Sequence, residues 1–85
     1  MKKISILGST GSIGKQALEV IKDHPDKFQV VGLAVMRSID DLEMQIRKFK
    51  PKAVAVYDPE KGKILANRIN GNTKIYTGIE GIIEI

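Results

Sequence analysis

The sequence predicts an α/β fold, in which a parallel sheet is built from strands joined by crossover helices in the order βαβαβαβ. Two observations predict it. Short runs rich in Ile, Val and Ala alternate with segments of about ten residues whose apolar positions recur at helical spacing. A glycine-rich segment separates the first such run from the first helical segment, as the tight turn of a βα unit requires.

The first half of the chain contains two predicted strands and one helix. The first strand is predicted at Ile4–Leu7 and the helix at Ser12–Asp23. The apolar residues of this helix form one stripe: Ile13, Ala17, Leu18, Val20 and Ile21. Pro25 disfavours helical geometry at His24, so the helix ends before it. The nearly continuous apolar run Phe28–Val35 is typical of a strand covered on both faces.

The alternation continues with a second helix and a third strand. The helix is expected to begin at Ser38–Asp41, which resembles a capping box with an acid in place of the usual Glu or Gln. It ends before Pro51 because proline disfavours helical geometry in the preceding residue. Its apolar stripe consists of Ile39, Leu42, Ile46 and Phe49. The buried strand Ala53–Tyr57 follows.

A third helix and a fourth strand complete the predicted elements. Asp58 and Pro59 are the residue types preferred at a helix N-cap and at the first helical position. This helix should end at the turn formed by residues 70–72. Lys74–Tyr76 is a short fourth strand, and another helix is expected to start near Gly78.

Length and composition restrict the class of protein. The 85 residues are 42% hydrophobic and 28% charged, a globular composition that suffices for one small domain. No apolar run reaches the ~20 residues of a transmembrane helix, and the absence of cysteine excludes disulfides and thiolate chemistry. We therefore expect a cytoplasmic protein without a membrane partner. The chain stops at Ile85 inside an apolar segment, which predicts that residues 1–85 are the N-terminal part of a longer, truncated domain.

The net charge of +4 does not indicate a nucleic-acid partner. The basic residues are scattered, and the cluster at Arg47–Lys52 falls at a predicted helix end, where cations complement the helix dipole. Interleaved aromatic residues that would stack on bases are nearly absent. We expect a solvated surface and no nucleic-acid binding.

The strongest functional signal is the loop after the first strand. Its sequence is Gly8-Ser9-Thr10-Gly11-Ser12-Ile13-Gly14. This G-x-x-G-x-x-G loop is a variant of the dinucleotide fingerprint of Rossmann-type sheets. One glycine makes the turn, another lets the backbone approach a pyrophosphate, and Gly14 lets the helix pack on the strand. The helix N-terminus and the hydroxyls of Ser9, Thr10 and Ser12 would bind phosphate oxygens. The alternative is a tight turn that binds nothing.

The end of the second strand indicates which dinucleotide is bound. Sheets that bind NAD usually have an acid here for the ribose hydroxyls, whereas this strand ends in Met36, Arg37 and Ser38. A guanidinium can hold a 2′-phosphate in bidentate fashion, which favours NADPH. Met36 would lie near the adenine. Alternatively, Arg37 is a surface residue and Ser38 only a cap, and Asp40 and Asp41 argue against a phosphate.

The sequence shows a place for a cofactor but no catalytic chemistry. His24 is the only histidine and lies at a helix end, far along the chain from the loop. Asp, Glu and His do not cluster at the spacing of a metal site. We therefore assign no catalytic and no metal-binding residue to these 85 positions.

The glycine loop is part of a longer resemblance to the 1-deoxy-D-xylulose 5-phosphate reductoisomerase family. The loop directly after Ile4–Leu7 is similar to the N-terminus of that family. The likeness continues through further segments: Ala17–Ile21, His24–Phe28, Val30–Leu33, Asp58 and Gly78–Ile82. It covers nearly all of this chain but only the first part of a family member.

The resemblance implies an enzyme of the non-mevalonate isoprenoid pathway, cytoplasmic or plastid and usually a homodimer. Such enzymes rearrange a sugar phosphate, deoxyxylulose phosphate, and reduce the product with NADPH to 2-C-methyl-D-erythritol 4-phosphate, using Mg or Mn. By position, Thr10–Ile13 would line the NADPH pyrophosphate, and Arg37 and Ser38 would lie at the 2′-phosphate and ribose. The metal and substrate-phosphate residues of the family would follow Ile85.

The sequence departs from the family at the end of the second strand. Members commonly have Ala-Gly, a basic residue and Asn where this chain has Val35, Met36, Arg37 and Ser38. Met36 removes the option of positive φ, and Ser38 has a shorter polar reach, while the basic position is kept. Two other functions stay open: another NADP-dependent dehydrogenase, such as a semialdehyde dehydrogenase, and a non-enzymatic nucleotide-sensing module.

Overall fold

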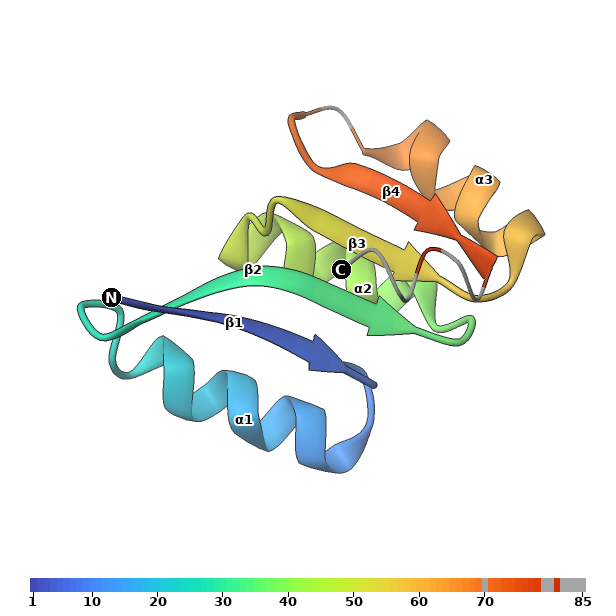
Figure 1. Ribbon diagram of the computed structural model, residues 1–85. Helices are drawn as coiled ribbons and strands as arrows, with labels where there is room; N and C mark the ends of the chain where they lie inside the picture. Colours follow the sequence, from blue (N-terminus) through green and yellow to red (C-terminus); the bar gives the residue numbers. More distant parts are fainter. Residues whose placement is uncertain (70, 79–80, 82–85) are drawn as a thin grey trace.

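The computed structural model describes residues 1–69, 71–78 and 81, and within them it has seven regular elements. They are β1 (Lys2–Leu7), α1 (Ser12–Lys22), β2 (Phe28–Val35), α2 (Ile39–Phe49), β3 (Ala53–Val56), α3 (Pro59–Arg68) and β4 (Lys74–Thr77) (Figure 1). The predicted order βαβαβαβ is confirmed, and most element boundaries agree within one or two residues. The helix expected near Gly78 falls mostly on positions outside the described residues.

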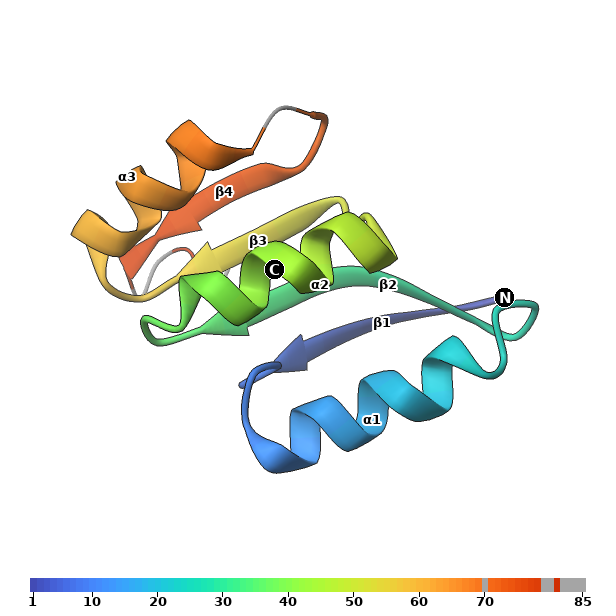
Figure 2. The same ribbon diagram turned by 180° about the vertical axis from the view of Figure 1, so that it is seen from behind.

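The four strands form one parallel sheet in the order β1-β2-β3-β4. Each new strand is therefore added on the same side of the one before. Crossovers between parallel strands are almost always right-handed, so a sheet that grows in one direction receives all its helices on one face. Figures 1 and 2 show this arrangement most clearly at α2, which lies behind the sheet in one view and in front of it in the other.

The core lies between the sheet and this layer of helices. Its fully buried large side chains are Leu33, Val54 and Val56 from the sheet and Leu42 and Leu65 from the helices. The last four residues of β2 are all buried, as the continuous apolar run predicted. The helical stripes supply the facing side chains, because apolar residues three or four positions apart share one side of a helix.

An irregularity in β2 adjusts which residues face the helices. Ile4 pairs with Val30 but Ser5 pairs with Gly32. Val31 is therefore an extra residue of β2 that has no partner in β1. Such a bulge changes the alternation of side chains between the two faces. Val30 and Leu33 both join the core cluster although they are three residues apart. The continuous apolar run hid this shift from sequence analysis.

The helix caps agree with the sequence prediction at one helix and differ at another. Asp58 caps α3 as predicted, because its Oδ1 accepts hydrogen bonds from the Glu60 and Lys61 N–H groups at 3.0 and 3.3 Å. The predicted capping box at Ser38 is wrong: Ser38 occupies the N-cap of α2, but its side chain makes no capping hydrogen bond. Its ψ of 71° lies outside the extended region usual for a capping serine. The hydroxyl is therefore not engaged by its own helix.

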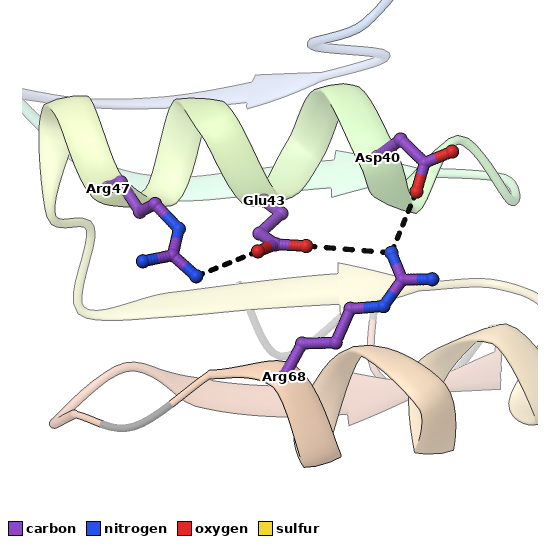
Figure 3. A network of polar contacts seen from close by, with 4 residues as sticks. All are labelled: Asp40, Glu43, Arg47 and Arg68. Atoms are coloured by element: carbon purple, nitrogen blue, oxygen red, sulfur yellow. Dashed lines mark hydrogen bonds and ion pairs between the residues drawn. The ribbon is translucent and has the colours of Figure 1, made fainter.

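A network of ion pairs joins α2 to α3 on the surface (Figure 3). The Arg68 guanidinium contacts Asp40 at 2.7 Å and Glu43 at 3.5 Å, and Arg47 contacts Glu43 at 2.8 Å. The hydrogen bond from Arg47 is the largest cause of a lowered Glu43 pKa, and the charges of both arginines lower it further. Because the pKa of Glu43 is lowered by folding, its ionised carboxylate stabilises the folded protein at pH values above the pKa of the unfolded chain. This stabilisation is lost as the pH falls through the pKa of the folded protein.

We predict that Arg47→Ala raises the pKa of Glu43 toward its ordinary value more than Arg68→Ala does. The reason is that Arg47 supplies the stronger hydrogen bond to this carboxylate. The measurement is an NMR titration of the Glu43 side-chain carboxyl. Lys63→Ala removes one positive charge from the exposed surface of α3 and serves as the control. Equal shifts in all three variants would show a general charge effect instead of these contacts.

Candidate functional site

The glycine loop lies at the carboxyl end of β1 and is anchored to β2. The Gly8 and Ser9 N–H groups both donate to the Ala34 carbonyl oxygen, at 2.7 and 3.2 Å. Gly8 has a φ of 79°, a left-handed conformation that favours glycine. The Gly11 N–H then donates back to the Gly8 carbonyl oxygen at 3.1 Å. The loop is thus a closed turn pinned to the neighbouring strand.

Gly14 allows α1 to lie directly on this loop. A Cβ at position 14 would stand 2.3 Å from the Gly8 carbonyl oxygen and 2.8 Å from the Ser9 Cα. Only a residue without a side chain fits, which is the role predicted for it. At Gly11 the nearest atom to a Cβ would be the Gly8 oxygen at 3.5 Å, an ordinary contact. The fold therefore requires glycine at position 14 and tolerates a small side chain at position 11.

The start of α1 has the properties of an anion site. Gly11 is the N-cap and has no side chain to bond the first helical N–H groups, and the first turn contains no acidic residue. The amides of Ser12, Ile13 and Gly14 begin the helix, where unpaired N–H groups and the positive end of the helix dipole favour negative charge. Ser12 is exposed, and Ile13 is 83% exposed. These residues are open to a ligand.

Ser9 differs from its expected role. Its side chain is completely buried, and its Oγ has no hydrogen-bond partner among the described residues. The hydroxyl therefore does not reach the surface where a pyrophosphate would lie, unlike the exposed Ser12 and the half-buried Thr10. Ser9 belongs to the loop through its backbone.

The end of β2 places Met36, Arg37 and Ser38 at the same edge of the sheet as the loop. All three are exposed, and the Arg37 side chain is 72% exposed. Arg37 lies 3.6 Å from Asp58 Oδ2, while the other oxygen of Asp58 caps α3. Met36 and Arg37 line a hollow of about 710 Å³ together with Tyr57. An exposed ion pair of this length is weak, so the guanidinium is free to turn toward a ligand.

A second hollow brings in a cation that sequence analysis missed. Lys61 of α3 lines a space of about 350 Å³ with Arg37 and Ser38. No local signal marked Lys61, because the hollow that it shares with Arg37 depends on how α3 packs next to α2. Asp40 and Asp41, which argued against a phosphate, are each paired with a cation: Arg68 at 2.7 Å and Lys15 at 3.3 Å.

Other kinds of site find no support in the described part of the chain. Residues 1–69, 71–78 and 81 contain no group of three His, Asp or Glu side chains that could hold a metal ion. No helix within these residues is long and apolar enough to cross a membrane. His24 is exposed in the turn after α1.

A parallel sheet whose first strand leads through a three-glycine turn into a helix with an open N-terminus defines the Rossmann-type dinucleotide-binding class. Comparisons with known proteins identify the family within this class. A sequence profile of the 1-deoxy-D-xylulose 5-phosphate reductoisomerase family matches residues 4–85. The chain belongs to this family.

Individual relatives show the same likeness. The chain is 52% identical to the 1-deoxy-D-xylulose 5-phosphate reductoisomerases of Microcystis aeruginosa and Thermodesulfovibrio yellowstonii, over 100% of this chain but 23% and 22% of theirs. A crystal structure of DOX-P reductoisomerase in complex with NADPH, fosmidomycin and magnesium matches 100% of this chain and 21% of its own, with a TM-score of 0.94 and 31% identity. The Zymomonas mobilis enzyme in complex with NADPH matches 98% of this chain and 22% of its own, with a TM-score of 0.91 and 27% identity.

The chain thus spans less than a quarter of the length of these relatives. The glycine loop by itself also allowed a semialdehyde dehydrogenase. The family match excludes this alternative.

We predict that Gly14→Ala destabilises the fold strongly whereas Gly11→Ala does not. The new methyl group at position 14 would overlap loop backbone that cannot move without separating α1 from β1. We expect a loss of roughly 2–4 kcal/mol for Gly14→Ala, in the upper range of single substitutions, and less than about 1 kcal/mol for Gly11→Ala. Urea unfolding followed by circular dichroism measures both. Equal stabilities would contradict the close approach at Gly14.

Proposed function

We propose that this chain is the N-terminal, NADPH-binding part of a 1-deoxy-D-xylulose 5-phosphate reductoisomerase. The observation that carries the proposal is the placement of an open helix N-terminus and an exposed arginine at the same edge of the sheet, on neighbouring strands. Two of the matching structures are complexes with NADPH, which supports this choice of dinucleotide.

In the proposed binding mode, the N-terminus of α1 binds the pyrophosphate and the end of β2 binds the adenosine. The pyrophosphate would lie against the backbone of Thr10–Ile13, where free amides and the helix dipole stabilise its charge. The adenosine would extend along the carboxyl ends of β1 and β2 toward Met36. Its 2′-phosphate would be held by Arg37 and the Ser38 hydroxyl, with Lys61 as a second cation. When bound, NADPH supplies the hydride for a reduction.

The activity of the whole protein would depend on residues outside this chain. We propose that it isomerises and reduces deoxyxylulose phosphate to 2-C-methyl-D-erythritol 4-phosphate as a cytoplasmic homodimer, with Mg or Mn. The described residues do not have the acidic cluster that such a metal needs, so we place no metal ligand on them. The role of this chain is to bind and orient the cofactor.

The first test uses Arg37→Glu in the full-length protein. We expect NADPH binding to weaken roughly 10- to 100-fold, because a charge-assisted contact to the 2′-phosphate becomes a repulsion. NADH, which has no such phosphate, should change less than about threefold. Calorimetric titration of both cofactors measures this. Lys63→Glu makes the same charge change on the exposed surface of α3 and is the control. Equal weakening of both cofactors by Arg37→Glu would mean that Arg37 does not discriminate between them.

The second test uses Gly11→Val. Position 11 has an extended φ of −79° and ψ of 172°, which a β-branched residue adopts readily. Its side chain would occupy the space in front of the helix N-terminus, so we expect dinucleotide binding to fall below detection while the protein stays folded. Titration with NADPH and thermal unfolding of the same sample separate the two effects. Unchanged affinity would contradict the assignment of the loop.

A further inference from the structure

One polar side chain outside the loop contacts its backbone directly. Gln45, in the middle of α2, donates a hydrogen bond from Nε2 to the Ser9 carbonyl oxygen at 2.9 Å. The two residues are 36 positions apart. Gln45 is half-buried and Ser9 is completely buried, so this bond is partly shielded from solvent.

The contact fixes the second of the two peptide units that flank the Ser9 Cα. The Ser9 N–H is already held by the Ala34 carbonyl oxygen. The Ser9 carbonyl belongs to the next peptide, which also contains the Thr10 N–H. That peptide is planar and trans, so its N–H points opposite to its C=O. Because Gln45 holds the carbonyl toward α2, the Thr10 N–H is turned away from α2, and it has no hydrogen-bond partner among the described residues.

We infer that Gln45 is a positioning residue that orients the Thr10 amide toward the dinucleotide pyrophosphate. This inference rests on the proposed function and adds a residue that would not touch the ligand. The chemistry requires a hydrogen-bond donor at this position. The Ser9 carbonyl accepts and cannot donate, so its partner must have an N–H or O–H. Met lacks a donor, and an ionised Glu would set a negative charge against the carbonyl.

The geometry predicts a pattern of affinity that differs from that of Arg37. The pyrophosphate is common to NADPH and NADH, so a misplaced Thr10 amide weakens both cofactors by the same factor. Loss of a contact at the 2′-phosphate changes the ratio of the two affinities instead. A loss of the Gln45 bond also leaves the buried Ser9 carbonyl without a partner, so the loop is expected to rearrange.

The test compares Gln45→Met and Gln45→Glu with the unaltered full-length protein. Methionine has nearly the same length and a good helix propensity, so α2 is preserved. We expect NADPH and NADH to bind about 5- to 30-fold more weakly in both variants, with an unchanged ratio between them. Amide hydrogen exchange at Gly11, whose N–H is bonded to the Gly8 carbonyl oxygen inside the loop, should become faster. Ile46→Val, one residue further on α2, reduces core packing without touching the loop and is the matched control for a general loss of stability.

The outcomes separate this inference from the proposed function. If the unaltered protein binds neither cofactor, the proposed function fails, and faster Gly11 exchange in Gln45→Met would still show that the side chain orders the loop. If the unaltered protein binds NADPH and Gln45→Met does so equally well, the inference is overturned. It is also overturned if Ile46→Val, at a similar loss of stability, weakens both cofactors as much.

Discussion

The close approach of α1 to the loop after β1 is the constraint on which the site depends. Gly14 lies so near the Gly8 carbonyl oxygen and the Ser9 backbone that a single methyl group would separate the helix from the strand. This contact brings the N-terminus of α1 to the carboxyl edge of the sheet. The same edge receives the ends of β2 and β3, because parallel strands all point in one direction. The open N-terminus of α1 and a cationic side chain at the end of β2 thereby lie at the same edge of the sheet.

The backbone of the loop is held from three directions, and each direction involves a different element. Its own turn supplies the bond from Gly11 to Gly8, β2 supplies the Ala34 carbonyl, and α2 supplies Gln45. A site that binds through backbone amides needs such support, because a misdirected N–H loses its hydrogen bond to the ligand. The exposed side chains around it, including Arg37 and Ser38, need less support because they can turn toward the ligand.

The strand order has a consequence for the rest of the family fold. With β1 to β4 in sequential order, the described helices cover one face of the sheet, and β1 pairs with only one neighbour within the described residues. In open α/β sheets the ligand lies where the strand order reverses, outside the carboxyl ends of the strands. The loop after β1 would stand at that point if a further strand joined the other side of β1, as the greater length of the relatives permits.

The order of the elements, their approximate bounds, the glycine loop and the family likeness follow from the sequence alone. Helical spacing, the continuous apolar run of β2 and the Asp58-Pro59 start of α3 are local patterns that need only neighbouring residues. The tertiary structure decided the other features: the bulge at Val31, the burial of Ser9, the unused Ser38 cap, the contact of Gln45 with the loop, and the hollow that Lys61 shares with Arg37. The physical reason is that these features depend on how elements 20 or more residues apart pack together, for example over the 36 positions between Ser9 and Gln45. A hydrophobic pattern records which residues are buried, but not which of them touch.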